Sequence, residues 1–165
     1  PTATPSMDIQ VSSNFERLLF DLAGRDGTAL AKMMAGFESS RAMSIPADML
    51  AGAKDLFSSA RIDATGMADA MRWAATHAGQ IIDPHTAIGL EAARRAGLPK
   101  DVPIVTLATA HAAKFSDAVE RATGVRPALP ARVGNLFDRE ERYDTLAATK
   151  EAVAAYVAER ATPAK

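Results

Sequence analysis

Cysteine is absent from this sequence of 165 residues. A chain without thiols forms neither disulfide bonds nor thiolate metal sites, and the absence of cysteine fits a cytoplasmic location. The three histidines include no pair at a spacing of four residues and stand beside no pair of carboxylates, so the sequence offers no metal-binding pattern. We therefore expect a cytoplasmic protein that holds no metal ion.

Neither sign of charge dominates, and long apolar runs are missing. The formal net charge is −1 at pH 7, which gives no electrostatic reason to expect nucleic acid or an anionic membrane as a partner. No apolar run approaches the roughly 18–20 residues that span a bilayer. The first five residues have neither the basic region nor the apolar run of a signal peptide, and they lack an initiator Met. We expect a chain that begins at a cut inside a longer protein or at a processed end.

Alanine-rich stretches with helical periodicity fill most of the chain. Hydrophobic residues make up 48% and charged residues 24% of the sequence, a profile typical of one folded domain or of one large fragment of an enzyme. Ser13 and Glu16 have the spacing of a capping box, and Asp83–Pro84 combines a capping carboxylate with a proline at the first helical position. The pattern predicts helices over residues 15–22, 28–37, 46–57, 63–79, 83–97, 113–123 and 143–159.

One segment has a different character, because residues 102–108 are apolar and rich in β-branched side chains. They predict a buried strand of the parallel type, with Pro103 near its start, where a strand tolerates proline best. Only residues 8–11 and 80–82 offer further short strands. A lone strand cannot satisfy its own backbone hydrogen bonds, so we expect an α/β fold whose partner strands lie in missing residues or in another chain.

Polar residues follow the predicted strand directly. In open α/β sheets, ligands bind beyond the carboxyl ends of the strands, and Thr109 and His111 occupy that place. The hydroxyl of Thr109 is placed either to exchange a hydrogen bond with a ligand or simply to cap the next helix. His111 is placed either to orient the loop or to move a proton.

Three short segments stand out in order along the chain: Met-Asp-Ile-Gln-Val-Ser-Ser-Asn at 7–14, Asp-Pro-His-Thr-Ala at 83–87 and Thr-Ala-His-Ala-Ala-Lys-Phe at 109–115. The third is similar to the Thr-Ala-His-Pro-Ala-Lys-Phe motif of threonine synthases. The first two resemble that family's Met-Asp-Val/Ile segment, which precedes an Asn-Phe helix start, and its acidic-Pro-His stretch. Ala112 stands where the family often has proline, which changes the stiffness of the loop but removes no polar group.

The resemblance implies a fold, a reaction and a cofactor. Threonine synthases are carbon–oxygen lyases that resemble tryptophan synthase β and use pyridoxal 5'-phosphate (PLP) to convert O-phospho-L-homoserine and water to L-threonine and phosphate. Residues 1–165 would form the C-terminal region of this α/β fold, mostly helical here, with one main strand at about 102–108. In this group a Ser or Thr hydroxyl faces the pyridine nitrogen of PLP, and by the motif match that residue is Thr109. Unlike a carboxylate, a neutral hydroxyl need not hold that nitrogen protonated.

Two parts that the family needs are missing from the sequence. None of the lysines sits in a setting like the family's Phe-Lys-Asp, and no Gly-rich loop for the cofactor phosphate is present. Lys114 lies inside the motif but in the first turn of a predicted helix. The resemblance therefore implies that the missing partner is the N-terminal half with its Schiff-base lysine. It also implies that these 165 residues contain no catalytic residue and are inactive alone.

His85, Thr86 and His111 are candidates for the substrate cleft. His85 stands early in a predicted helix, where it is placed to line the cleft, to help bind the substrate phosphate at the helix N-terminus, or to serve as a structural histidine bonded to a neighbouring loop. Two other functions stay open. One is a PLP enzyme like threonine dehydratase, which shares the scaffold. The other is a non-enzymatic helical interaction module, against which the isolated strand argues.

Overall fold

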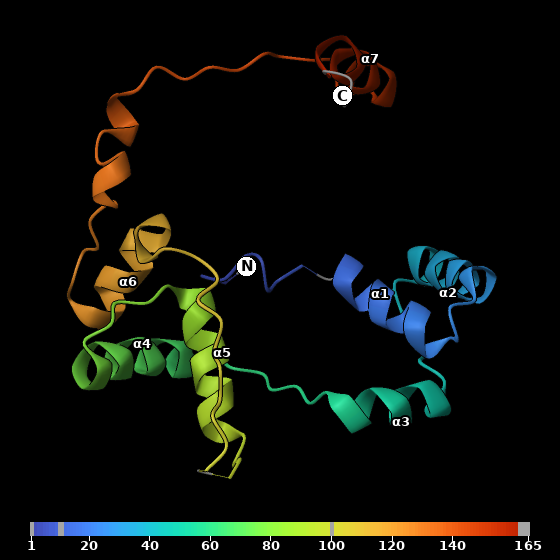
Figure 1. Cartoon of the computed structure of the whole chain (residues 1–165), viewed down its shortest axis with the longest axis horizontal. Helices are drawn as coiled ribbons and strands as arrows, with labels where there is room; N and C mark the ends of the chain where they lie inside the picture. The colour runs from blue at the N-terminus through green and yellow to red at the C-terminus, as the bar shows by residue number, and fades with distance from the viewer. Residues whose placement is uncertain (1, 10–11, 100, 162–165) are drawn as a thin grey trace. The chain divides into compact units, whose positions relative to one another are not determined.

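The computed structural model of the chain describes residues 2–9, 12–99 and 101–161, and it divides into two units, Pro1–Ala128 and Leu129–Lys165 (Figure 1). Helices joined by irregular segments make up both units. In chain order the elements are α1 (Ser13–Leu22), α2 (Gly27–Ser40), α3 (Ala47–Leu56), α4 (Ala64–Ala78), α5 (Pro84–Arg95), the 3₁₀-helix η1 (Ala112–Phe115), α6 (Ser116–Thr123), the 3₁₀-helices η2 (Ala131–Val133) and η3 (Leu136–Asp138), and α7 (Lys150–Arg160).

Helix ends in the first unit follow local chemistry that the sequence predicts. Asp63 begins α4 by accepting a hydrogen bond from the backbone N–H of Gly66 at 2.8 Å. Asp83 begins α5, with proline in the first turn as predicted. Gly79 and Gly124 end α4 and α6 with φ of 61° and 76°, a left-handed conformation in which a β-carbon would be strained. The capping box of α1 is wrong, because its N-cap residue makes no side-chain cap bond.

The main core lies where α4 packs against α5 and α6 (Figure 1). Apolar residues recur at helical spacing along α4, so one face of that helix is buried. Alanines in this face let the helices approach closely, and methionine fills the space between them. The buried core residues are Met67, Ala70, Met71, Ala87, Ala112 and Val119.

A smaller group of helices comprises α1, α2 and α3, with α1 in contact with both of the others. Its buried residues are Leu19 of α1, at 1% exposure, and Met49 of α3, at 8%. Gly52 of α3 lies against Leu22, and a β-carbon at Gly52 would stand 3.2 Å from the Leu22 side chain. No residue of α2 is buried, so this helix contributes only partly covered side chains to the group. Its Met34 and Phe37 border a small apolar cavity of about 100 Å³.

The strand predicted at residues 102–108 is wrong for this chain: no described residue forms a strand. Residues 103–109 carry no regular secondary structure, because a strand exists only where a second strand completes its hydrogen-bonded ladder. Of the two possible partner segments, residues 80–82 are irregular, and the segment 8–11 lies partly outside the described residues. The physical objection to a lone strand therefore holds, while the strand itself does not form.

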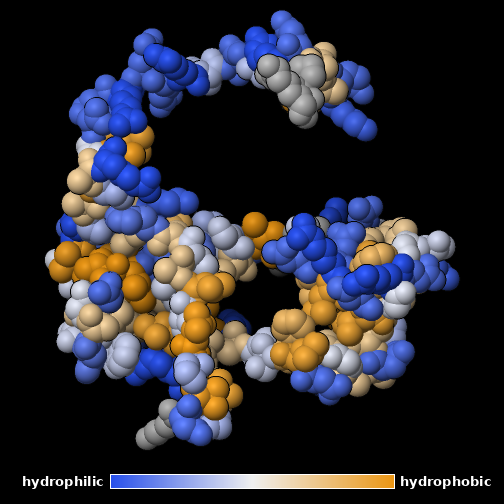
Figure 2. All heavy atoms as spheres, in the orientation of Figure 1, coloured by the Kyte–Doolittle hydropathy of each residue, from blue (hydrophilic) through white to orange (hydrophobic). Residues whose placement is uncertain are grey.

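The same segment nevertheless runs beside α5. The backbone N–H of Thr109 donates to the hydroxyl of Thr86 near the start of α5, and the side chain of Thr106 lies 3.4 Å from the β-carbon position of Gly89. The segment and the helix therefore run in opposite directions, as a helix and its following strand do in α/β folds. Figure 2 shows apolar residues at the surface along the course of this segment in Figure 1, consistent with exposures of 81% for Val105 and 74% for Leu107.

The second unit contains one α-helix in its described part, α7. The predicted helix of residues 143–159 is wrong over its first seven residues: the helix begins after Thr149, whose hydroxyl accepts from the N–H of Ala152 at 3.2 Å. The hydroxyl of Tyr156 donates to Asp144 at 2.6 Å, and the Arg160 guanidinium lies 3.9 Å from the centre of the Tyr156 ring. None of the described helices in either unit is long and apolar enough to cross a membrane.

Candidate functional site

The carboxylate of Asp83 is fully buried at the N-terminus of α5. Its Oδ1 accepts hydrogen bonds from the backbone N–H of His85 at 2.9 Å and from Nδ1 of the same residue at 3.0 Å. Its Oδ2 accepts from the backbone N–H of Thr86 at 3.3 Å and from the Thr86 hydroxyl. Four donors therefore surround one carboxylate, which also lies at the positive end of the helix.

This arrangement bears on the idea that His85 helps to bind a phosphate at the start of α5. A phosphate at a helix N-terminus needs free backbone N–H groups. Here the N–H groups of His85 and Thr86 both donate to Asp83. A second anion would also be repelled by the carboxylate. The geometry therefore disfavours a phosphate site at this helix end.

The imidazole of His85 is buried, with 5% exposure. The bond from Nδ1 to Asp83 means that Nδ1 carries a proton, which orients the ring. The ring centre lies 4.6 Å from that of Phe115, with the planes tilted by 54°. Nε2 is buried and has no hydrogen-bond partner among the described residues. Such an atom costs about 1–3 kcal/mol when left unsatisfied, so a polar group from a ligand or from further protein is expected there.

Thr86 links the Asp83 carboxylate to the segment that carries Thr109. The Thr86 hydroxyl donates its proton to Asp83 and accepts the backbone N–H of Thr109 at 3.1 Å. Both functions of this buried hydroxyl are thus in use inside the protein. The hydroxyl of Thr109, in contrast, belongs to an exposed residue and bonds to no described residue. Of the two hydroxyls, that of Thr109 is therefore the one available to bind a ligand.

His111 rather than Thr109 caps the following helix. Its Nδ1 accepts the backbone N–H of Ala113 at 3.1 Å, at the start of η1. His111 is exposed, and this bond caps the start of η1. Lys114 is exposed in η1, where its ammonium group lies 5.9 Å from the centre of the Phe115 ring.

A cavity of about 520 Å³ lies beside the N-terminal segment and the start of α4. It is lined by charged residues, including Asp8, Arg61 and Asp63, and by the apolar side chains of Met67 and Ile88. Hydrogen bonds from the backbone and hydroxyl of Thr2 hold the pKa of Asp8 below its usual 3.8. None of the four candidate residues His85, Thr86, Thr109 and His111 lines this cavity.

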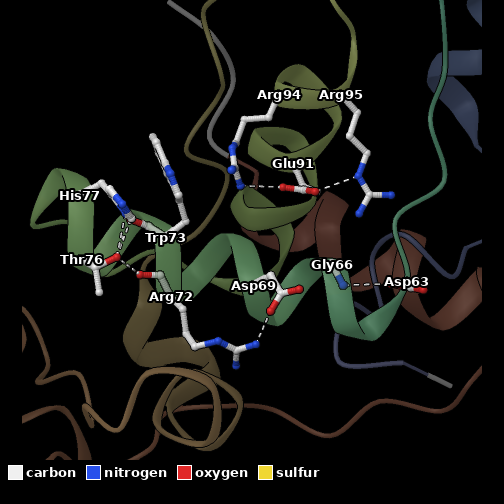
Figure 3. Close-up of polar contacts among 10 residues, drawn as sticks. All are labelled: Asp63, Gly66, Asp69, Arg72, Trp73, Thr76, His77, Glu91, Arg94 and Arg95. Atoms are coloured by element: carbon white, nitrogen blue, oxygen red, sulfur yellow. Dashed lines mark hydrogen bonds and ion pairs between the residues drawn. The ribbon is translucent and has the colours of Figure 1, made fainter.

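A second polar group covers the outer side of α4 and α5, drawn in Figure 3. Glu91 accepts from Arg94 at 2.9 Å and from Arg95 at 2.8 Å. The Arg94 guanidinium also lies 4.6 Å from the centre of the Trp73 ring, and Trp73 stacks on His77 at 5.3 Å. These contacts tie the two helices together at the surface, where ion pairs contribute little.

The comparisons with known proteins bear directly on the motif segments. The family described as "Threonine synthase, C-terminal" matches residues 86–157. Threonine synthase of Pseudomonas aeruginosa is 43% identical over the whole of this chain, and that of Corynebacterium glutamicum is 33% identical over 94% of it. The chain belongs to the threonine synthase family.

Solved structures of threonine synthases also match the fold of this chain. The PLP-bound enzyme from Brucella melitensis matches 98% of this chain with a TM-score of 0.82 and 41% identity. The yeast enzyme matches 86% of it with a TM-score of 0.76 and 28% identity. The chain spans about a third of the length of the threonine synthases that it matches: 35% of the Pseudomonas protein and 35% of the Brucella chain. The family resemblance carried by the three motif segments is thereby confirmed.

Asp83 is the functional candidate that the sequence did not reveal. Its role as a helix cap was predicted, but its bonds to the His85 ring and to the Thr86 hydroxyl were not. The spacing alone gives a signal for these bonds, since side chains two and three residues after an N-cap stand close to the cap carboxylate. The link to Thr109 is 23 residues long in sequence and needs the folded chain.

Proposed function

We propose that this chain is the C-terminal region of a longer threonine synthase, which converts O-phospho-L-homoserine and water to L-threonine and phosphate with PLP as cofactor. The observation that carries the proposal is the match of the entire chain, at 43% identity, to a third of the Pseudomonas threonine synthase. The PLP-bound state of the Brucella relative supports the choice of cofactor. In this proposal residues 1–165 are one part of the catalytic fold, and the intact enzyme is a cytoplasmic carbon–oxygen lyase that acts on a phosphate ester.

The residues near the motif fit PLP at one point. Thr109 is exposed, its hydroxyl bonds to no described residue, and its backbone is held by Thr86. PLP, when bound, supplies an electron sink for charge that develops on the substrate carbons. The task of Thr109 is then to exchange a hydrogen bond with the pyridine nitrogen while adding no charge beside it.

His85 has a different task in this proposal. Its proton on Nδ1 is held by Asp83, so Nε2 is left to meet a polar group of the substrate or of the remaining protein. His111 keeps the start of η1 in place. Thr86 contacts the loop rather than the substrate, since its hydroxyl already has a donor and an acceptor.

The Schiff-base lysine and the phosphate-binding loop would come from the part of the relatives that this chain does not span. Residues 102–108 would add a strand to the sheet of that part. Two features support this: the segment runs antiparallel to α5, and its Val105 and Leu107 side chains are exposed. An extended segment with a free backbone edge is suited to pairing with another strand.

An assay on the full-length protein that contains this chain tests the proposal. With PLP and O-phospho-L-homoserine, we expect phosphate and L-threonine to be released in equal amounts. Deamination of threonine with no reaction of phosphohomoserine would favour an enzyme like threonine dehydratase. Sedimentation and circular dichroism of the 165-residue chain address the remaining alternative: a monomeric, cooperatively unfolding helical domain in a full-length protein inactive on both substrates would favour an interaction module.

A further inference from the structure

Both ends of the motif segment Thr109–Phe115 are held by residues that bond to Asp83. At one end, Oδ2 of Asp83 accepts from the Thr86 hydroxyl, which accepts the backbone N–H of Thr109. At the other end, Oδ1 fixes the His85 ring, which packs against Phe115. One buried carboxylate thus connects, through two neighbouring side chains, to both ends of a seven-residue segment.

We propose that Asp83 and Thr86 are positioning residues, which set the backbone at Thr109 so that its hydroxyl faces the cofactor. This inference rests on the proposed function, because it takes Thr109 to be the residue that meets the pyridine nitrogen. It assigns Thr86 to the loop and not to the substrate cleft.

The bonding pattern explains why a hydroxyl is needed at position 86. The group there must accept a hydrogen bond from Thr109 and donate one to Asp83 at the same time, and among neutral side chains of this size a hydroxyl does both with one atom. The Thr86 hydroxyl and the Asp83 carboxylate are both buried, so the hydrogen bond from the Thr109 amide to this pair constrains the backbone of the exposed Thr109. Residues 103–109 have no regular secondary structure, so this hydrogen bond is what fixes the backbone at the end of the segment.

The test uses the full-length protein and measures PLP affinity by titration of the apo form. Thr86→Val keeps the shape and removes both hydrogen bonds, so PLP affinity should fall about 10-fold, the effect of losing one well-formed hydrogen bond. Thr86→Ser restores the hydroxyl and should bind within about 2-fold of the parent protein. Thr76→Val is the matched control, because the bonds of the Thr76 hydroxyl stay within α4, including one to the His77 ring, and it should leave PLP affinity unchanged.

A double-mutant cycle separates positioning from general destabilisation. Thr86→Val should weaken PLP binding in the parent but have less than about a 2-fold effect when Thr109→Val is already present, since the hydroxyl to be positioned is gone. Effects that multiply in the double variant would overturn the proposal. The positioning proposal would also be overturned if Thr86→Val bound PLP with parental affinity while Thr109→Val bound it more weakly. That result would leave the proposed function intact. If Thr109→Val binds PLP as well as the parent, the proposed cofactor contact is itself wrong.

Hydrogen exchange supplies a readout that does not depend on the cofactor. The amide proton of Thr109 is bonded to Thr86, so it should exchange faster in apo Thr86→Val, and at the parental rate in Thr86→Ser. Should Thr86→Val fail to fold, the change Asp83→Asn replaces it, because the single acceptor oxygen of Asn cannot serve all four donors that His85 and Thr86 direct at Asp83. Parental exchange at Thr109 in Thr86→Val, or in Asp83→Asn where that variant replaces it, would overturn the proposal.

Discussion

Replacing Asp83 by alanine tests the bonding pattern at the start of α5 without any cofactor. The change removes the N-cap of α5, a loss of about 1 kcal/mol of unfolding free energy. It also leaves Nδ1 of His85 and the hydroxyl of Thr86 buried without their acceptor, at about 1–3 kcal/mol for each unsatisfied donor. The Thr86 hydroxyl is able to rotate toward another acceptor, which lowers its contribution to the loss of unfolding free energy. The expected total is about 3–5 kcal/mol.

The matched control is Asp63→Ala. Asp63 caps α4 in the same helix group, is exposed, and accepts a single backbone N–H, from Gly66. Its loss should cost about 1 kcal/mol, the usual value for a cap alone. The difference between the two variants therefore isolates the buried side-chain donors around Asp83.

The assay is urea unfolding of the chain followed by fluorescence. Trp73 is the only tryptophan in the sequence and lies in α4, so its signal reports on the helix group that both caps serve. Equal slopes of unfolding free energy against urea would show that the variants unfold by the same transition. A loss in Asp83→Ala no larger than the loss in Asp63→Ala would refute the claim that the carboxylate supports His85 and Thr86.

Two further predictions concern other parts of the chain. A hydrogen bond to Asp144 raises the pKa of Tyr156 above its usual 10.0, so Asp144→Asn should lower the midpoint of the phenolate absorbance titration, and an unmoved midpoint would contradict this bond. The contribution of the bond to stability is fully present below pH 10.0 and is lost as the pH rises through the Tyr156 pKa. The 165-residue chain mixed with PLP and treated with borohydride should show no single modified lysine by mass spectrometry. One stoichiometrically modified site, at Lys114 for example, would show that these residues hold the cofactor alone.

Local chemistry explains the parts of the fold that the sequence predicts well. The starts of α4 and α5 follow from an aspartate cap, and the ends of α4 and α6 from glycine in a left-handed conformation. These signals act over one or two helical turns and need nothing from the rest of the chain. The same holds for the buried face of α4, whose apolar spacing meets α5 directly.

Two of the wrong predictions, the capping box of α1 and the early start of α7, fail locally, and the others depend on distant partners. The apolar spacing of α2 indicates a buried face, but no residue of this helix is buried although α1 packs against it. Residues 143–149 continue the pattern of α7, yet the helix starts at the Thr149 cap. The strand at 102–108 requires a ladder that no described residue supplies. The end of the predicted strand and the motif both point to Thr109, but its bond to Thr86 joins residues 23 apart and depends on the folded chain.

In the proposed intact enzyme, residues 103–109 would connect the central sheet to the cofactor contact at Thr109. Thr106 lies against Gly89 of α5, whereas Val105, Leu107 and Thr109 are exposed. Burying a valine or leucine contributes about 1.5–3 kcal/mol, so covering Val105 and Leu107 would favour docking of further protein on this exposed surface. Such docking would therefore cover the same exposed surface that includes the Thr109 hydroxyl. Completing the sheet and enclosing the cofactor contact would then be one event, with Thr86 fixing the end of the segment before either partner arrives.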